Sequence, residues 1–89
     1  MTLDQVVAER ERVLARMASI QGVVPRPSMA NFVLFDVEEH EKVYKRLLKK
    51  GVSVRDVSKY EELRSSLRVT IGSPEENEDF LKALAVAVK

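Results

Sequence analysis

The sequence predicts a small α/β (α+β) two-layer sandwich, in which three helices pack on a mainly antiparallel or mixed sheet of three to four strands. Three observations predict this class. Three segments carry apolar residues at helical spacing, two short segments alternate apolar and polar residues, and the two kinds of segment are interspersed along the chain. With 89 residues the chain has room for one domain, residues 1–89.

The first helix is expected over residues 2–21, where apolar residues recur every three or four positions. Thr2 and Gln5 match a capping box, and Gly22 fits the end of the helix. The segment that follows contains prolines, which cannot donate to a sheet ladder. Within it, Val23 and Val24 fit a short edge strand that enters a turn.

Residues 31–35 form an unbroken apolar run, which predicts a central strand covered on both faces. Residues 37–50 predict a second helix, with Asp36 as its candidate N-cap and Gly51 at its end. Its expected buried stripe consists of Val43, Tyr44, Leu47 and Leu48. The strand–helix–strand unit over residues 31–55 fits a parallel right-handed crossover, or a unit that feeds an antiparallel neighbour across a gap, and the sequence does not decide between them.

Residues 52–55 and 67–71 alternate apolar and polar side chains, which is typical of strands with one covered face. A polar connection over residues 56–66 joins them. The last helix begins at Ser73, because this N-cap residue is followed by Pro74 and, three positions on, by Glu76. Its apolar face consists of Phe80, Leu81, Leu84 and Val88.

Composition excludes several kinds of site. The chain has no cysteine and one histidine, so it lacks a disulfide framework, a thiolate site, a cysteine nucleophile and a multi-histidine metal centre. Its net charge of +1 gives no bulk electrostatic case for nucleic acid or an anionic membrane. No apolar run approaches the roughly 18 residues of a membrane span. The charged N-terminus lacks the apolar core of a signal peptide, so we expect a cytoplasmic protein.

The two alternating strands carry the most informative candidate residues. If the strands are neighbours, their valines and leucine face the helices, and Arg55 and Arg68 leave the opposite face together, with Ser53 and Thr70 nearby. Two guanidinium forks on one face suit a carboxylate or a phosphate. The structural alternative is an exposed strand face that simply carries arginine for solubility, or arginines that pair with Asp56 or with Glu61 and Glu62.

The remaining candidates favour structural roles. His40 lies beside Glu38, Glu39 and Glu41, but this pattern is typical of a solvated helix face more than of a metal site. The start of the last helix is predicted to be a plain structural cap and not an anion site, because its own glutamates already offset the helix dipole. No lysine looks desolvated enough for a Schiff base. The sequence therefore predicts no catalytic, cofactor-binding or metal-binding residue in this chain.

Three stretches together resemble a known family: residues 27–35 (PSMANFVLF), 51–56 (GVSVRD) and 67–77 (LRVTIGSPEEN). They resemble the C-terminal small domain of histidinol-phosphate aminotransferase, a fold-type-I pyridoxal-phosphate-dependent enzyme of histidine biosynthesis. The resemblance covers nearly the whole chain. It implies that Arg55 and Arg68 match the family's substrate-holding arginines: Arg68 the one that pairs with the substrate carboxylate or its equivalent, and Arg55 the one near the phosphate of histidinol phosphate.

The resemblance also implies what this chain lacks. The Schiff-base lysine, the aspartate at the pyridine nitrogen and the phosphate-cup residues belong to the family's large domain. We therefore expect an isolated domain without pyridoxal phosphate, inactive alone, whose partners are the large domain and an anionic substrate such as histidinol phosphate or glutamate. The surface that meets the large domain would favour self-association. The alternative is a stand-alone α/β ligand-binding or dimerisation module.

Overall fold

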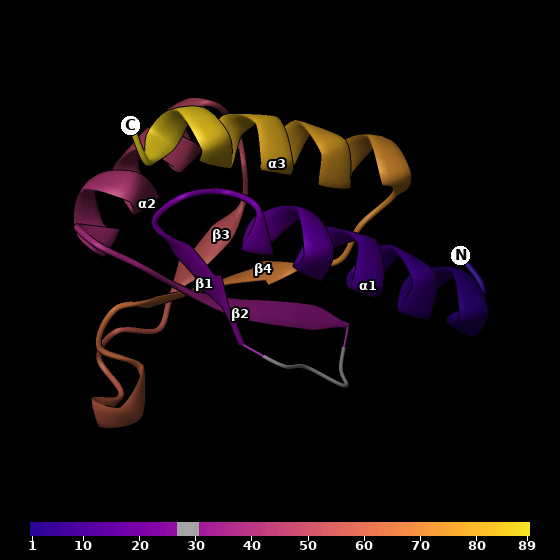
Figure 1. Cartoon of the computed structure of the whole chain (residues 1–89), viewed down its shortest axis with the longest axis horizontal. Coiled ribbons are helices and arrows are strands. Elements are labelled where there is room, and N and C mark those ends of the chain that lie inside the picture. The colour runs from indigo at the N-terminus through magenta and orange to yellow at the C-terminus, as the bar shows by residue number, and fades with distance from the viewer. Residues whose placement is uncertain (27–30) are drawn as a thin grey trace.

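The computed structural model describes residues 1–26 and 31–89. Residues 27–30, which open the first stretch of the family resemblance, lie outside the described residues. The order of helices and strands agrees with the sequence prediction, with one short 3-10 helix, η1, added in the polar connection (Figure 1). The elements are α1 (Leu3–Ala18), β1 (Val23–Pro25), β2 (Phe32–Val37), α2 (His40–Lys49), β3 (Val54–Asp56), η1 (Glu61–Leu63), β4 (Ser66–Thr70) and α3 (Pro74–Ala87).

The four strands form one sheet in the order β1-β2-β4-β3, and every neighbouring pair is antiparallel. Because β4 lies between them, β2 and β3 run parallel to each other without pairing. The unit β2–α2–β3 is therefore a split crossover with an antiparallel strand in the gap, one of the two arrangements that the sequence left open. This topology places the strand with Arg68 in the interior of the sheet and the strand with Arg55 at its edge.

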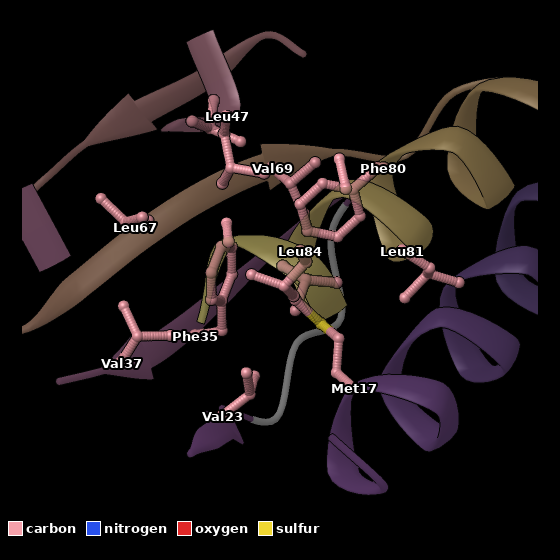
Figure 2. Packing of buried hydrophobic residues seen from close by; sticks show 14 of the residues in the cluster. Met17, Val23, Phe35, Val37, Leu47, Leu67, Val69, Phe80, Leu81 and Leu84 are labelled. Atoms are coloured by element: carbon pink, nitrogen blue, oxygen red, sulfur yellow. The ribbon is translucent and has the colours of Figure 1, made fainter. Parts of the chain in front are cut away.

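All three helices cover the same face of the sheet (Figure 1). α1 lies against β1 and β2, α2 lies against the other half of the sheet, and α3 packs against both helices. The core between the layers contains the fully buried Met17, Phe35, Leu47, Leu67 and Leu84 (Figure 2). Phe35 of β2 meets Phe80 of α3 edge to face, with ring centroids 5.7 Å apart. Within the described residues, none of the three α-helices lies on the opposite face of the sheet.

Both predicted capping boxes are present. The Thr2 hydroxyl accepts from the Gln5 amide at 3.2 Å, and the Ser73 hydroxyl accepts from the Glu76 amide at 3.2 Å. α1 ends at Ala18, three residues earlier than expected, and Gly22 instead occupies the turn into β1 with a φ of +90°. Gly51, with a φ of +78°, follows the end of α2 as predicted.

Four predictions about the middle of the chain were wrong. β2 is a central strand, but only one of its faces is covered, so its burial alternates along the strand. Asp36 is not an N-cap: β2 runs through it to Val37, and α2 begins at His40 after Glu39, which has a φ of 52°. In α2, Val43 and Leu47 are buried, whereas Leu48 is 46% exposed. β3 starts at Val54, two residues later than expected.

Candidate functional site

Arg55 of β3 and Arg68 of β4 are directly paired across the sheet. Val54 and Val69, the next pair along, are buried under the helices, so the two arginines leave the open face. Directly opposite residues of antiparallel strands have Cα atoms about 4.5–5.5 Å apart. The two side chains therefore start from neighbouring points on the same surface, as the alternation of the two strands predicts.

The surroundings of the two arginines differ. Arg68 is half-buried and is directly paired with Leu34 of β2. Its guanidinium carbon lies 5.3 Å from the centroid of the Phe32 ring. Arg55 is exposed at the sheet edge. The open face thus presents two cations beside an apolar strip contributed by β2.

Neither Arg55 nor Arg68 forms an ion pair within residues 1–26 and 31–89. Glu61 instead faces Arg64 at 3.6 Å. Asp56 accepts from the Ser58 amide at 2.9 Å. Burial opposes ionisation of Asp56, but the hydrogen bonds from Ser58 outweigh it and lower the pKa of this carboxyl, so Asp56 is ionised and already bound. Pairing of the two arginines with Asp56, Glu61 or Glu62 is therefore not seen in the described part of the chain.

The two hydroxyls expected near the arginines are placed differently. Thr70 pairs with Phe32 on β2 and is exposed on the open face, two positions from Arg68. Ser53 precedes β3 and is not paired in the sheet. It lines a hollow of about 390 Å³ that also includes Thr70 and Asn77, beside the start of α3. Of these two hydroxyls, the one of Thr70 therefore lies on the same strand face as Arg55 and Arg68.

A polar cluster at the other end of the open face was missed by the sequence analysis. The Ser66 hydroxyl donates to Asp36, and the Arg26 Nε donates to the same carboxylate at 3.1 Å. Arg26 also donates to the Glu62 carbonyl at 3.2 Å. The Asp36 carboxylate is therefore already engaged. No local signal points to this cluster, because residues 32–37 do not alternate apolar and polar side chains, and the register that puts Asp36 opposite Ser66 is set by the pairing of β2 with β4.

The other sequence candidates are His40 and the start of α3. Within the described ranges no group of histidine, aspartate and glutamate side chains could hold a metal ion, His40 and its glutamate neighbours included. The Ser73 amide donates to Glu76 Oε1 at 2.9 Å, which completes the cap of α3. The hydrogen bonds from Ser73 lower the pKa of Glu76, so the helix start carries its own anion. The Glu76 carboxylate already offsets the helix dipole at the start of α3.

None of the lysines in the chain offers the buried amine that a Schiff base with pyridoxal phosphate uses. A Schiff-base lysine must be desolvated to react as a neutral amine at ordinary pH. Every lysine in the chain is exposed. No part of the cofactor's covalent chemistry can therefore be assigned to these residues.

Comparison with known proteins identifies the family of the chain. The family model for aminotransferase class I and II matches residues 2–84. The histidinol-phosphate aminotransferase of Aquifex aeolicus is 49% identical over 89 residues, covering 98% of this chain and 25% of the relative. That of Thermoanaerobacter pseudethanolicus is 38% identical over 79 residues, covering 89% of this chain and 22% of the relative. The chain thus spans about a quarter of the length of these relatives.

Solved structures show the same relationship. The histidinol-phosphate aminotransferase from Clostridium acetobutylicum matches with a TM-score of 0.82 at 30% identity, covering 91% of this chain and 25% of that one. A putative aminotransferase from Burkholderia pseudomallei matches with a TM-score of 0.87 at 30% identity, covering 97% and 26%. None of the helices in the described residues has the length and apolar character that a membrane span requires. The chain belongs to the aminotransferase class I and II family.

Proposed function

We propose that residues 1–89 act as the C-terminal small domain of a histidinol-phosphate aminotransferase in cytoplasmic histidine biosynthesis, and that Arg55 and Arg68 bind the anionic groups of its substrates. One observation carries this proposal: two arginines occupy directly paired strand positions with no carboxylate partner among the described residues. The names of the relatives support the choice of enzyme.

The pairing has a physical cost that an anion would relieve. Like charges directly opposite each other destabilise a pair of strands. A carboxylate or phosphate between the two guanidinium groups turns that repulsion into two sets of charge-assisted hydrogen bonds. Histidinol phosphate carries a phosphate, and the co-substrate glutamate carries two carboxylates. A pair of guanidinium forks accepts either kind of group, as an aminotransferase with two such substrates requires.

The open face also supports a role in domain closure. It carries half-buried Phe32 and Leu34 on β2, and Val24 of the edge strand is 61% exposed. Apolar side chains that lie next to functional cations favour a surface that is covered during the working cycle. We propose that the large domain of the enzyme covers it, brings the cofactor to the arginines, and leaves this chain inactive when alone.

Anion binding is tested by NMR titration of the chain with inorganic phosphate and with glutamate. We expect the amides around Arg55 and Arg68 to shift most, and Arg68→Gln to weaken the response to both anions. Arg64→Gln is the matched control, because it removes the same charge from an exposed arginine of the β3–β4 connection. If Arg64→Gln and Arg68→Gln weaken binding equally, the arginine pair is not the site.

The cofactor and partner parts are tested separately. Mixed with pyridoxal phosphate, the chain should give no visible aldimine band that survives dilution, and a persistent band would contradict the claim that it is inactive alone. The competing function is a stand-alone dimerisation or ligand-binding module. A monodisperse dimer whose arginine face is protected from solvent would favour that module.

A further inference from the structure

We infer that Phe32 is a positioning residue, which holds the Arg68 guanidinium in place on the open face and so makes Arg68 the fixed member of the pair and Arg55 the mobile one. This inference rests on the proposed function of the pair, and it names a residue that the pattern of the two arginine-bearing strands does not reveal.

The contact follows from the register of β2 and β4. Phe32 is directly opposite Thr70, and Leu34 is directly opposite Arg68, so Phe32 lies diagonally from Arg68 on the same face. Diagonal neighbours in a sheet are within reach of aromatic and long side chains. The observed separation of 5.3 Å between the Arg68 Cζ and the ring centroid lies within the range of a cation–π interaction.

A contact with an aromatic ring suits a positioning role because the ring attracts the guanidinium cation without neutralising its charge. Within the described residues no carboxylate pairs with Arg68, so its N–H donors are available to an anion. A long side chain that is ordered before binding loses less conformational entropy on binding. Phe32 therefore raises anion affinity without touching the anion.

Arg55 has no such support. It is exposed on the edge strand, and within the described residues neither an ion pair nor an aromatic ring holds it. Arg68, in contrast, has Leu34 on one side and Phe32 diagonally across. One arm of the pair is thus preorganised and the other is free to adjust. This asymmetry lets one site accommodate anions of different size.

The test is ¹⁵N relaxation at the Nε of both arginines, combined with titration of inorganic phosphate. In the unmodified chain we expect restricted motion at Arg68 and free motion at Arg55. Phe32→Leu should make Arg68 as mobile as Arg55 and weaken phosphate binding about two- to tenfold, the cost of ordering one long side chain. Phe32→Tyr should restore both properties, because it keeps the ring.

Tyr60→Leu is the matched control: it removes a ring that contacts the cation of Lys59 at 5.4 Å, away from the paired arginines. It should change neither Arg68 mobility nor phosphate affinity. Equal mobility of the two arginines in the unmodified chain would overturn the inference, as would unchanged phosphate affinity in a folded Phe32→Leu variant. The proposed function fails by a different result, namely equal phosphate binding by the unmodified chain and by Arg68→Gln.

Discussion

Arg16 of α1 and Glu78 of α3 form a bidentate ion pair, with Nη1–Oε1 and Nη2–Oε2 distances of 3.0 and 3.1 Å. Arg12 donates to the same carboxylate at 3.0 Å and also donates to Glu9, which precedes it by one turn of α1. The network joins the first and last helices of the chain above the core. It therefore holds α1 and α3 side by side in the helix layer.

This network predicts a loss of stability in acid. Hydrogen bonds from Arg16 and Arg12 lower the pKa of Glu78 from 4.5 to about 2. A carboxyl whose pKa is lower in the folded chain stabilises it above the unfolded pKa, and that contribution is lost as the pH falls from about 4.5 to about 2. Glu78→Gln should therefore lower the free energy of unfolding at pH 7, and its difference from the unmodified chain should shrink towards pH 2.

Urea denaturation at several pH values measures this difference. Glu75→Gln is the control, since Glu75 lies in the same helix and forms no ion pair within the described residues. The effect should also decrease in high salt, because the pair is partly exposed. A loss that stayed the same from pH 7 to pH 2 would show that Glu78 acts through packing and not through its charge.

Asn77 is the buried polar link between α3, α1 and the end of β4. Its amide nitrogen donates to Glu9 at 2.9 Å and to the Gly72 carbonyl at 3.0 Å, and its oxygen accepts from the Gly72 amide at 2.9 Å. Asn77→Ala leaves these groups without partners in a mostly buried place, so we expect a loss of about 1–3 kcal/mol. Thermal denaturation checks it, with the exposed Asp79→Ala as control. Equal losses in the two variants would show that the bonds contribute nothing net.

The parts of the fold that the sequence predicts best are those decided by neighbouring residues. The two capping boxes need only a hydroxyl and a carboxyl or amide three positions apart, and both form as expected. The arginine pair followed from alternation in two short strands, since a period of two fixes which side chains share a face. The assumption that those strands are neighbours was the only long-range step.

The parts that could not be predicted depend on where the layers lie. The apolar run from residue 32 to residue 35 does not say whether a second layer covers it, so the open side of β2 was missed. The role of Asp36 depends on its register with Ser66, thirty residues away, and on Arg26 beyond a turn. Phe32 became a partner of Arg68 through the same register. Each of these contacts is decided by strand pairing and not by local pattern.

Leu47 and Leu48 provide a direct test of which side of α2 is buried. Leu47 is fully buried, whereas Leu48 is 46% exposed, although both belong to the apolar stripe of the sequence. Leu47→Ala should cost about 2–5 kcal/mol through lost burial and a cavity. Leu48→Ala should stay within about 0.5 kcal/mol, as for most surface positions. Chemical denaturation measures the loss of stability in the two variants. A larger loss for Leu48→Ala than for Leu47→Ala would show that α2 buries the side that carries Leu48.

The open face predicts concentration-dependent self-association of the chain. Val24 on the edge strand β1 is 61% exposed; it is paired with Asp36 and lies on the same face of the sheet as Phe32 and Leu34. A lysine on an edge strand opposes pairing with another chain, so Val24→Lys should lower the average mass measured by light scattering. Val86→Lys is matched in charge and nearly in exposure, at 53%, but lies on α3 in the helix layer. If Val86→Lys disrupts association and Val24→Lys does not, the self-association surface lies on the helices and not on the open face of the sheet. The helices would then also be the surface that we expect the large domain to cover.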